Sequence, residues 1–379
     1  MNNPASQAKP CNRSRAFAPV HPRAKHGYYL VALCLGLFCA PAISRALTFN
    51  FVPSAGTSQA AINGFAAAGA RWSSLFTDNV TVNVNIDFSA LGVGILGSTG
   101  SSQGTTSYTN FKNALAADRT STADFTAVAN LQSGSAFSLL MNRTSNSPFG
   151  AGSATTFLDN DGDANNTTVR LTFANAKALG LLSANNTASD ASISFSNLFS
   201  WDFNPTDGIT AGAFDFVGVA THEIGHALGF ISGVDILDGN SSTTFFADNQ
   251  FTYVSPLDLF RHSAQSGTAI DWAADARSKY FSIDGGASSI ADFSTGLTWG
   301  DGRQASHWKD NLGLGIMDPT SAPGELLSIS ADDALAFDVI GWNRSSTNIP
   351  DQTSSLALII MGAAGLVAFR RRLKTSPES

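Results

Sequence analysis

Cysteine is scarce in this sequence and confined to its amino-terminal end. All three cysteines, Cys11, Cys34 and Cys39, precede residue 47. The rest of the chain can therefore form no disulfide bond and can offer no thiolate to a metal ion. This absence excludes the class of zinc sites that requires a cysteine ligand.

Glutamate and histidine are also rare. Residues 47–349 contain only two glutamates, Glu223 and Glu325, although the whole chain has 29 acidic residues. Aspartate therefore carries nearly all of the acidity. Two of the six histidines lie at positions 21 and 26, which leaves His222, His226, His262 and His307. One of the rare glutamates lies between two of the rare histidines, at residues 222–226, and this coincidence indicates a functional site.

The charge of the chain is unevenly distributed. Only 13% of the residues are charged, so Ser, Thr, Asn and Gly must supply much of the polar surface. Ten of the 22 basic residues lie in residues 1–46 and 370–374. Residues 47–349 contain 12 basic and 27 acidic residues, a net charge of −15, compared with −7 for the whole chain. We therefore expect no nucleic-acid partner.

Residues 1–46 have the three parts of a secretory signal peptide. Residues 1–25 are basic and free of acidic side chains, and residues 28–38 are apolar. Small residues that suit cleavage follow between Ala40 and Ala46. We expect an exported protein, located in the cell envelope, at the cell surface or outside the cell.

Residues 347–379 are predicted to be a C-terminal sorting signal or membrane anchor. The segment has Pro350 near its start, a mostly apolar run at residues 356–369 and three arginines at residues 370–372. Such a run can anchor a chain transiently in a membrane with its arginines in the cytoplasm. It also resembles the tripartite signals cleaved by exosortases, with Pro-Asp-Gln in place of the usual Val-Pro-Glu-Pro. This resemblance implies an exosortase-type sorting machinery as a partner.

Between these ends the periodicity predicts a mixture of helices and strands. We expect helices at residues 60–72, 108–117, 123–131, 174–182 and 329–342, strands at 80–88 and 192–199, and a hairpin of 279–283 with 288–293. The Gly- and Ser-rich residues 91–106 are predicted to be a loop. The strand at 192–199 precedes the central motif and is a candidate for the cleft rim that pairs with a substrate backbone.

An acidic turn lies at residues 159–163, with the sequence Asp-Asn-Asp-Gly-Asp. It resembles turns that bind calcium, but its glycine comes two places too early for an EF-hand. Calcium as a second cofactor and a plain solvated turn therefore both stay open.

The central motif is HExxH, within the run FDFVGVATHEIGHALGF at residues 214–230. Read as a helix, this run places His222 and His226 one turn apart on one face, where both can bind one zinc ion. Glu223 is offset around the helix and can reach a water at that metal. Gly229 is suited to let the chain leave the helix. Chance occurrence of the motif in a buried helix is the alternative.

A catalytic zinc ion needs a third protein ligand and one open position. The compact pattern HExxHxxGxxH would use position 232, which is a serine, and Glu325 is too distant for the pattern with a glutamate ligand. The remaining candidates are Asp235, Asp258, His262 and His307. His307 is favoured because Met317 follows it in the tight turn Gly-Ile-Met-Asp-Pro, which can place a methionine beneath the ligands.

These motifs resemble the leishmanolysin type of metzincin peptidase and a group of exported, exosortase-sorted bacterial proteins with the same core. The resemblance covers residues 214–230 and 300–342. It implies zinc bound by His222, His226 and His307, Glu223 as catalytic base, Gly229 at the turn and Met317 below the metal.

The resemblance also implies an α+β fold and its domain plan. We expect a twisted sheet, an active-site helix, a long insertion before the third ligand, a Met-turn and a C-terminal helix, within one domain at residues 47–346. Residues 47–230 would form its N-terminal subdomain, and residues 231–346 would carry the insertion, third ligand and terminal helix. The implied activity is that of a secreted zinc-dependent endopeptidase acting on peptides or proteins.

A second hypothesis belongs to a different class of function. A non-catalytic binding protein of the cell surface or matrix could keep the same scaffold, and the Ser-, Gly- and Asn-rich composition fits it equally well. The intact Glu223 favours the enzyme, because a binding protein has no need of that carboxylate.

Overall fold

The computed structural model describes residues 47–240 and 246–345. The predicted signal peptide and the predicted sorting signal or membrane anchor lie outside these residues. Within the two described ranges, no helix combines the length and the hydropathy needed to cross a bilayer. The elements belong to the α+β class, as predicted, and form several small sheets.

A four-stranded sheet supports the site. Its strands, in spatial order, are β1 (Thr48–Pro53), β2 (Thr81–Ser89), β8 (Ala191–Ser196) and β3 (Gly97–Ser101). β1, β2 and β8 are parallel, and β3 pairs antiparallel with β8 at the edge. Val82, Val84 and Ile86 alternate on the buried face of β2, so the strand predicted at residues 80–88 is confirmed.

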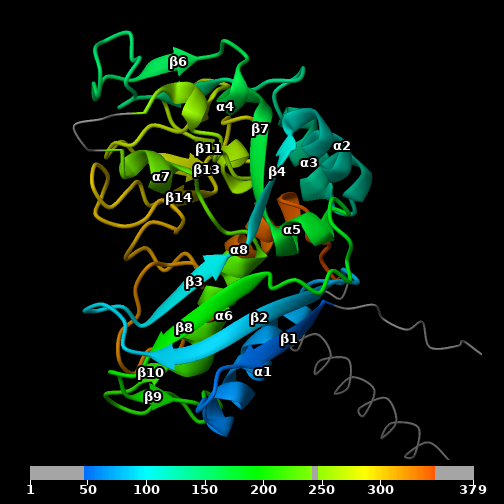
Figure 1. The fold of residues 1–379 in the computed structure, drawn as a ribbon, viewed down its shortest axis with the longest axis vertical. Helices are drawn as coiled ribbons and strands as arrows, with labels where there is room; N and C mark the ends of the chain where they lie inside the picture. Colours follow the sequence, from blue (N-terminus) through cyan, green and yellow to red (C-terminus); the bar gives the residue numbers. More distant parts are fainter. Residues whose placement is uncertain (1–46, 241–245, 346–379) are drawn as a thin grey trace, which may run out of the picture. The chain divides into compact units, whose positions relative to one another are not determined.

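Two helices, α1 (Gln59–Ser73) and α6 (Phe216–Leu228), pack together against this sheet (Figure 1). Phe65 of α1 and Phe216 of α6 both contact the ring of Phe195 on β8, at centroid distances of 5.3 and 4.6 Å. The helices approach closely because Gly64 leaves room for the Phe216 ring, which a Cβ atom there would meet. Both predicted helices are confirmed.

The prediction of a loop at residues 91–106 is confirmed for residues 91–96 and was wrong for the rest. This segment contains β3 and β4 (Gln103–Ser107), and β4 pairs antiparallel with β7 (Thr168–Thr172). A half-buried strand is recognised in a sequence by apolar residues at alternating positions. β3 and β4 consist mainly of glycine, serine and threonine, so they lack this pattern. Backbone pairing with β8 and β7 forms these strands, and that pairing depends on partners far along the chain.

The other elements of the first half are short. They are α2 (Tyr108–Asp118), α3 (Thr122–Asn130), β5 (Leu139–Met141), β6 (Phe157–Asp159), α4 (Ala164–Thr167), α5 (Phe173–Ala178), β9 (Trp201–Asp202) and β10 (Phe214–Asp215). α2 and α3 confirm two predicted helices. α5 ends before the predicted residue 182, because the chain turns at Gly180, where φ is 67°.

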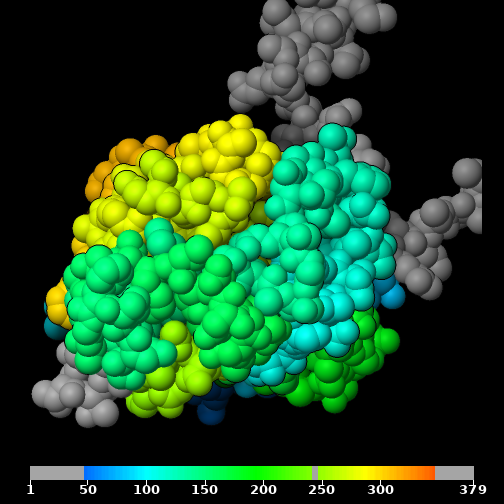
Figure 2. Space-filling view, turned by 90° about the horizontal axis from the view of Figure 1, so that it is seen from above, coloured from blue at the N-terminus to red at the C-terminus, as the bar shows by residue number. Residues whose placement is uncertain are grey.

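The long segment between α6 and His307 has little regular structure. It contains α7 (Val234–Asp238), the 3-10 helices η1 (Asp248–Gln250) and η2 (Leu257–Phe260), β11 (Arg261–His262), β12 (Ile270–Asp271), β13 (Lys279–Phe281) and β14 (Ala291–Phe293). β13 and β14 form the predicted hairpin, and β12 pairs with β5. Figure 2 shows this segment, in yellow, beside the teal and green residues that include α2 and α3.

The last described helix, α8 (Ala331–Val339), confirms the predicted terminal helix. Ser330 caps it, and Asp333 completes a capping box with Ser330. Phe337 of α8 is fully buried and its ring lies 4.6 Å from that of Trp72 on α1. α8 therefore shares a core with the helices behind the sheet.

Candidate metal centre

Local signals define both ends of α6. The side chain of Asp215 accepts a hydrogen bond from the Gly218 amide at 2.8 Å and caps the amino-terminal end. Gly229 ends the helix with a φ of 124°, a conformation that L side chains rarely adopt. A Cβ atom at this glycine would also approach Ile340 and Asn175 to 3.2 and 3.3 Å. These signals set the bounds of the helix, and helical geometry then places His222 and His226 one turn apart.

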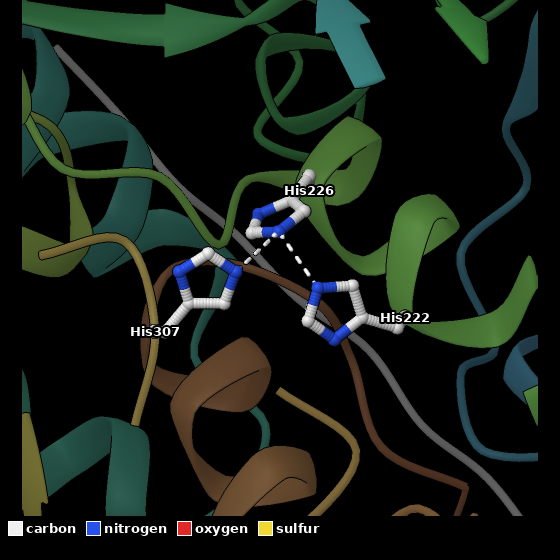
Figure 3. A group of neighbouring side chains, drawn as sticks. All are labelled: His222, His226 and His307. Atoms are coloured by element: carbon white, nitrogen blue, oxygen red, sulfur yellow. Dashed lines mark hydrogen bonds between the residues drawn. The ribbon is translucent and has the colours of Figure 1, made fainter. Parts of the chain in front are cut away.

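The structure brings His307 to the two histidines of α6. The Nε2 atom of His226 lies 3.1 Å from Nε2 of His222 and 3.2 Å from Nε2 of His307. Figure 3 shows the three rings pointing toward one another. Their ligand atoms all lie within 4.8 Å of one another, and His307 is 7% exposed. The sequence-predicted ligand set is thus assembled in space.

The second nitrogen of each ring faces a backbone carbonyl. Nδ1 of His222 lies 2.7 Å from the Ile316 oxygen, and Nδ1 of His226 lies 2.7 Å from the Phe230 oxygen. Nδ1 of His307 lies 3.3 Å from the Gln304 oxygen. A carbonyl only accepts hydrogen bonds, so each Nδ1 carries the proton and each neutral Nε2 presents a lone pair to the centre.

This arrangement fits a divalent cation. Burial lowers the pKa of His222 to about 4, and burial together with the nearby His222 lowers that of His226 to about 3. The pKa of His307 is also well below its usual range, because of burial and the other two rings. The rings are therefore neutral near pH 7. A tetrahedral zinc ion with bonds of about 2.05 Å would separate its nitrogen ligands by about 3.3 Å, close to the two Nε2 separations.

Glu223 lies directly after His222 and is 5% exposed. Its Oε2 accepts a hydrogen bond from Oγ1 of Thr99 on β3 at 2.6 Å, and the same hydroxyl lies 2.9 Å from the Glu223 carbonyl oxygen. Gly97, also on β3, leaves room for the carboxylate, since a Cβ atom there would lie 2.7 Å from Oε1. Burial raises the pKa of Glu223 to about 7, although the Thr99 hydrogen bond opposes this shift.

The turn that contains Met317 packs beneath the helix. Met317 is fully buried, and its sulfur occupies the space beside Gly225 where a side chain would otherwise lie. Asp333 of α8 holds the turn, because it accepts hydrogen bonds from the amides of Ile316 at 2.7 Å and Met317 at 3.3 Å. The same carboxylate accepts the indole N–H of Trp308 at 2.8 Å.

The other candidate ligands lie elsewhere. Asp235 accepts the amides of Ala305 and Ser306, and Asp258 accepts those of Gly233 and Ser255. His262 is buried outside the cluster. Across residues 47–240 and 246–345, no other three His, Cys, Asp or Glu side chains come as close together. The acidic turn at residues 159–163 therefore forms no such cluster, and Asp159 accepts instead from Asn165 at 2.6 Å.

The strand beside the centre is β3, not β8. β8 lies between β2 and β3, so both of its edges are paired and it offers no edge to a substrate. β3 pairs only with β8 among the described strands. Thr99 and Ser101 of β3 bind Glu223 and the His226 carbonyl, and sequence reasoning missed both residues. The sequence offered no periodic signal for them, because every residue of β3 is Gly, Ser or Thr.

The centre supports a metal-dependent activity. Three neutral imidazoles can hold a cation with affinity for nitrogen, and Glu223 can exchange a proton beside them. No protein-family model, curated protein or solved structure matches this chain.

Proposed function

We propose that this protein is a zinc-dependent endopeptidase of metzincin-like architecture. The observation that carries the proposal is the convergence of three neutral imidazoles next to a buried glutamate on the same helix. This combination supplies metal ligands and a base, the two components that hydrolysis of a peptide bond requires. Met317 under the helix and the helix α8 behind it match the order of parts expected from the resemblance.

His222, His226 and His307 would hold the metal through Nε2. Their Nδ1–H groups donate to backbone carbonyls, which fixes the tautomer and the orientation of each ring. When bound there, a zinc ion would supply Lewis-acid chemistry, lowering the pKa of a water from about 15.7 towards 7 and polarising the scissile carbonyl.

Glu223 is the proposed general base. With a pKa of about 7 in the metal-free protein, its carboxylate can accept a proton near neutral pH. It would take this proton from the attacking water and return it to the amine that leaves. The Thr99 hydroxyl holds one carboxylate oxygen, so the direction of the carboxylate is set before a substrate arrives.

The substrate would be an extended polypeptide. β3 is the last strand of its sheet and lies against α6, so an added strand there would run beside the histidines. Pairing through backbone groups binds peptides with little dependence on side chains. This geometry favours a peptide over a compact small molecule.

The proposed place of action is outside the cytoplasm. Its support is the signal-peptide pattern of residues 1–46 and the tripartite pattern of residues 347–379. Both segments lie outside the described residues, and an exosortase-type sorting machinery stays part of the proposal.

The test is cleavage of denatured casein by the full-length protein, with zinc content measured on the same sample. We expect one zinc per chain and activity that a chelator abolishes and zinc restores. Glu223→Gln should keep the zinc but lose activity by about 10²- to 10⁴-fold. Glu325→Gln is a matched control, because Glu325 is the other glutamate of the domain and is exposed. Undiminished cleavage by Glu223→Gln would contradict the proposal.

A further inference from the structure

Two carboxylates on α7 hold the chain that leads to His307. Asp235 and Asp238 lie on the same short helix, which begins eight residues after His226. Each accepts hydrogen bonds from two consecutive backbone amides of the later segment. Asp235 binds the amides of residues 305 and 306, and Asp238 binds those of residues 298 and 299.

Asp235 acts on the turn that immediately precedes His307. Its Oδ1 accepts the Ala305 amide at 2.6 Å, and its Oδ2 accepts the Ser306 amide at 3.2 Å. On the other side of this turn, the guanidinium of Arg261 donates to the Ala305 carbonyl oxygen. Arg261 is fully buried and also donates to the Ser294 carbonyl oxygen at 3.2 Å. Both polar groups of Ala305 are thus held by charged side chains.

The same turn orients the third ligand. The Gln304 carbonyl oxygen, one residue before Ala305, accepts the Nδ1–H of His307 at 3.3 Å. The His307 carbonyl oxygen accepts the Ser294 amide at 3.0 Å. Residues 304–307 therefore have their backbone and the His307 ring directed by contacts that involve no metal.

We propose that Asp235, together with Arg261, is a positioning residue that pre-forms the third-ligand turn and thereby sets the affinity of the centre for its metal. The inference rests on the proposed metal centre but not on the peptidase activity. His307 follows His226 by 81 residues, so its return to the helix has an entropic cost that grows with the length of the intervening chain. If the turn is already formed in the metal-free protein, this entropic cost belongs to folding and does not reduce the free energy of metal binding.

Asp238 provides a matched control on the same helix. It accepts the amides of Thr298 at 2.7 Å and Trp299 at 2.8 Å, so it has the same chemistry as Asp235. It is 3% exposed, which makes its replacement at least as disruptive to packing. The two aspartates differ in where they act, because the hydrogen bonds of Asp238 hold the segment eight to nine residues before His307.

The experiment measures zinc affinity in the full-length protein and its variants Asp235→Asn, Asp235→Ala and Asp238→Asn. Zinc is titrated into chelator-treated protein in competition with a chromophoric chelator, and thermal unfolding of the metal-free samples reports the fold. We expect each Asp235 variant to bind zinc about 10- to 100-fold more weakly, the range typical of losing a group that orients a metal ligand, and Asp238→Asn to stay within about threefold. Cobalt bound in place of zinc absorbs visible light, and its spectrum depends on the ligands. This spectrum should change in the Asp235 variants, because a displaced His307 alters the ligand field of the ion.

Two outcomes would overturn the inference. One is an affinity of folded Asp235→Asn within about threefold of the unaltered protein. The other is an equal loss in Asp238→Asn, which would make the effect a general loosening of the segment. If the unaltered protein binds zinc but cleaves no peptide, the proposed peptidase activity is contradicted and the inference about Asp235 is unaffected. If the unaltered protein binds no metal, both are contradicted.

A measurement on the unaltered protein covers the case in which the Asp235 variants fail to fold. Hydrogen exchange of the Ala305 and Ser306 amides is followed in metal-free and zinc-loaded samples. Pre-formation predicts that both amides are already protected without metal and change little when zinc is added. Rapid exchange that slows only with zinc would show that the metal orders the turn, and the inference would fall.

Discussion

The candidate metal centre is made of two halves that are built differently. His222 and His226 are four residues apart on one helix, so helical geometry alone places them together. His307 lies 81 residues beyond His226, between β14 and α8, where the chain forms no helix or strand. One half is thus fixed by local structure and the other by tertiary contacts.

The second half depends on aspartates that each bind several donors. Asp333 holds two amides of the Met317 turn and the indole of Trp308, and Asp235 holds two amides before His307. Asp258 similarly binds the amides of Gly233 and Ser255. The short side chain of aspartate keeps its carboxylate close to the backbone, which suits it to hold irregular chain.

The largest test of the comparison removes one ligand from each half. His226→Ala and His307→Ala should each reduce zinc affinity by more than the roughly 100-fold that loss of an outer partner can cost. Both should abolish peptide cleavage at ordinary zinc concentrations. Calorimetric titration of zinc into each variant gives the affinity.

The buried histidine outside the cluster supplies the control for this pair. His262→Asn should leave zinc binding unchanged, because His262 takes no part in the group of three. If His307→Ala bound zinc as tightly as His262→Asn, the long-range half would not contribute to the centre, and the site would consist of the helix alone.

The sequence predicted most of the local half and only part of the distant half. The HExxH helix, Gly229 at its end and the terminal helix were predicted from short-range rules, whereas the Asp215 cap is known from the structure. His307 was selected through Met317 and a family resemblance, not through contacts. The functions of Asp235 and Thr99 could not be predicted, because they depend on which distant amides and carboxylates the fold places beside them. β3 was missed because Gly and Ser carry no periodic signal.

The second test asks whether the local half is independent of β3. Thr99→Val removes the hydroxyl that binds Glu223 and keeps the shape of the side chain. A hydrogen bond to a charged group contributes about 1.5 to 3 kcal/mol, so we expect kcat to fall by about tenfold or more. KM should change little, because the hydroxyl holds the base and not the substrate. Steady-state kinetics on a fluorogenic peptide separates the two constants.

Thr99→Ser restores a hydroxyl and should recover most of the activity. Ser98→Ala, on the exposed face of the same strand, should leave both constants near their original values. An unchanged kcat in Thr99→Val would show that α6 orients Glu223 without help from β3.

The smallest expected effect concerns an aspartate that joins two segments far apart in the sequence. Asp78 accepts the amide of Asn343 at 2.9 Å across 265 residues, and burial raises its pKa to about 7 from the usual 3.8. Between these values the folded protein binds more protons than the unfolded chain. Stability conferred by this group is therefore complete below about pH 4 and is lost as the pH rises through about 7.

Asp78→Asn should flatten this dependence. An amide cannot ionise, so the slope of the unfolding free energy between pH 4 and 7 should decrease by up to about 1.4 kcal/mol per pH unit. Chemical denaturation at several pH values gives the slope. The half-buried Asp118, whose pKa is raised to about 6 mainly by burial, will retain part of the dependence in the variant. Asp87→Asn is the control, because the pKa of that carboxyl is lowered by a hydrogen bond from Ser54. An equal slope in Asp78→Asn and the unaltered protein would mean that Asp78 is ionised in the fold throughout this range. Asp78 would then bind the Asn343 amide as a carboxylate at every pH in this range.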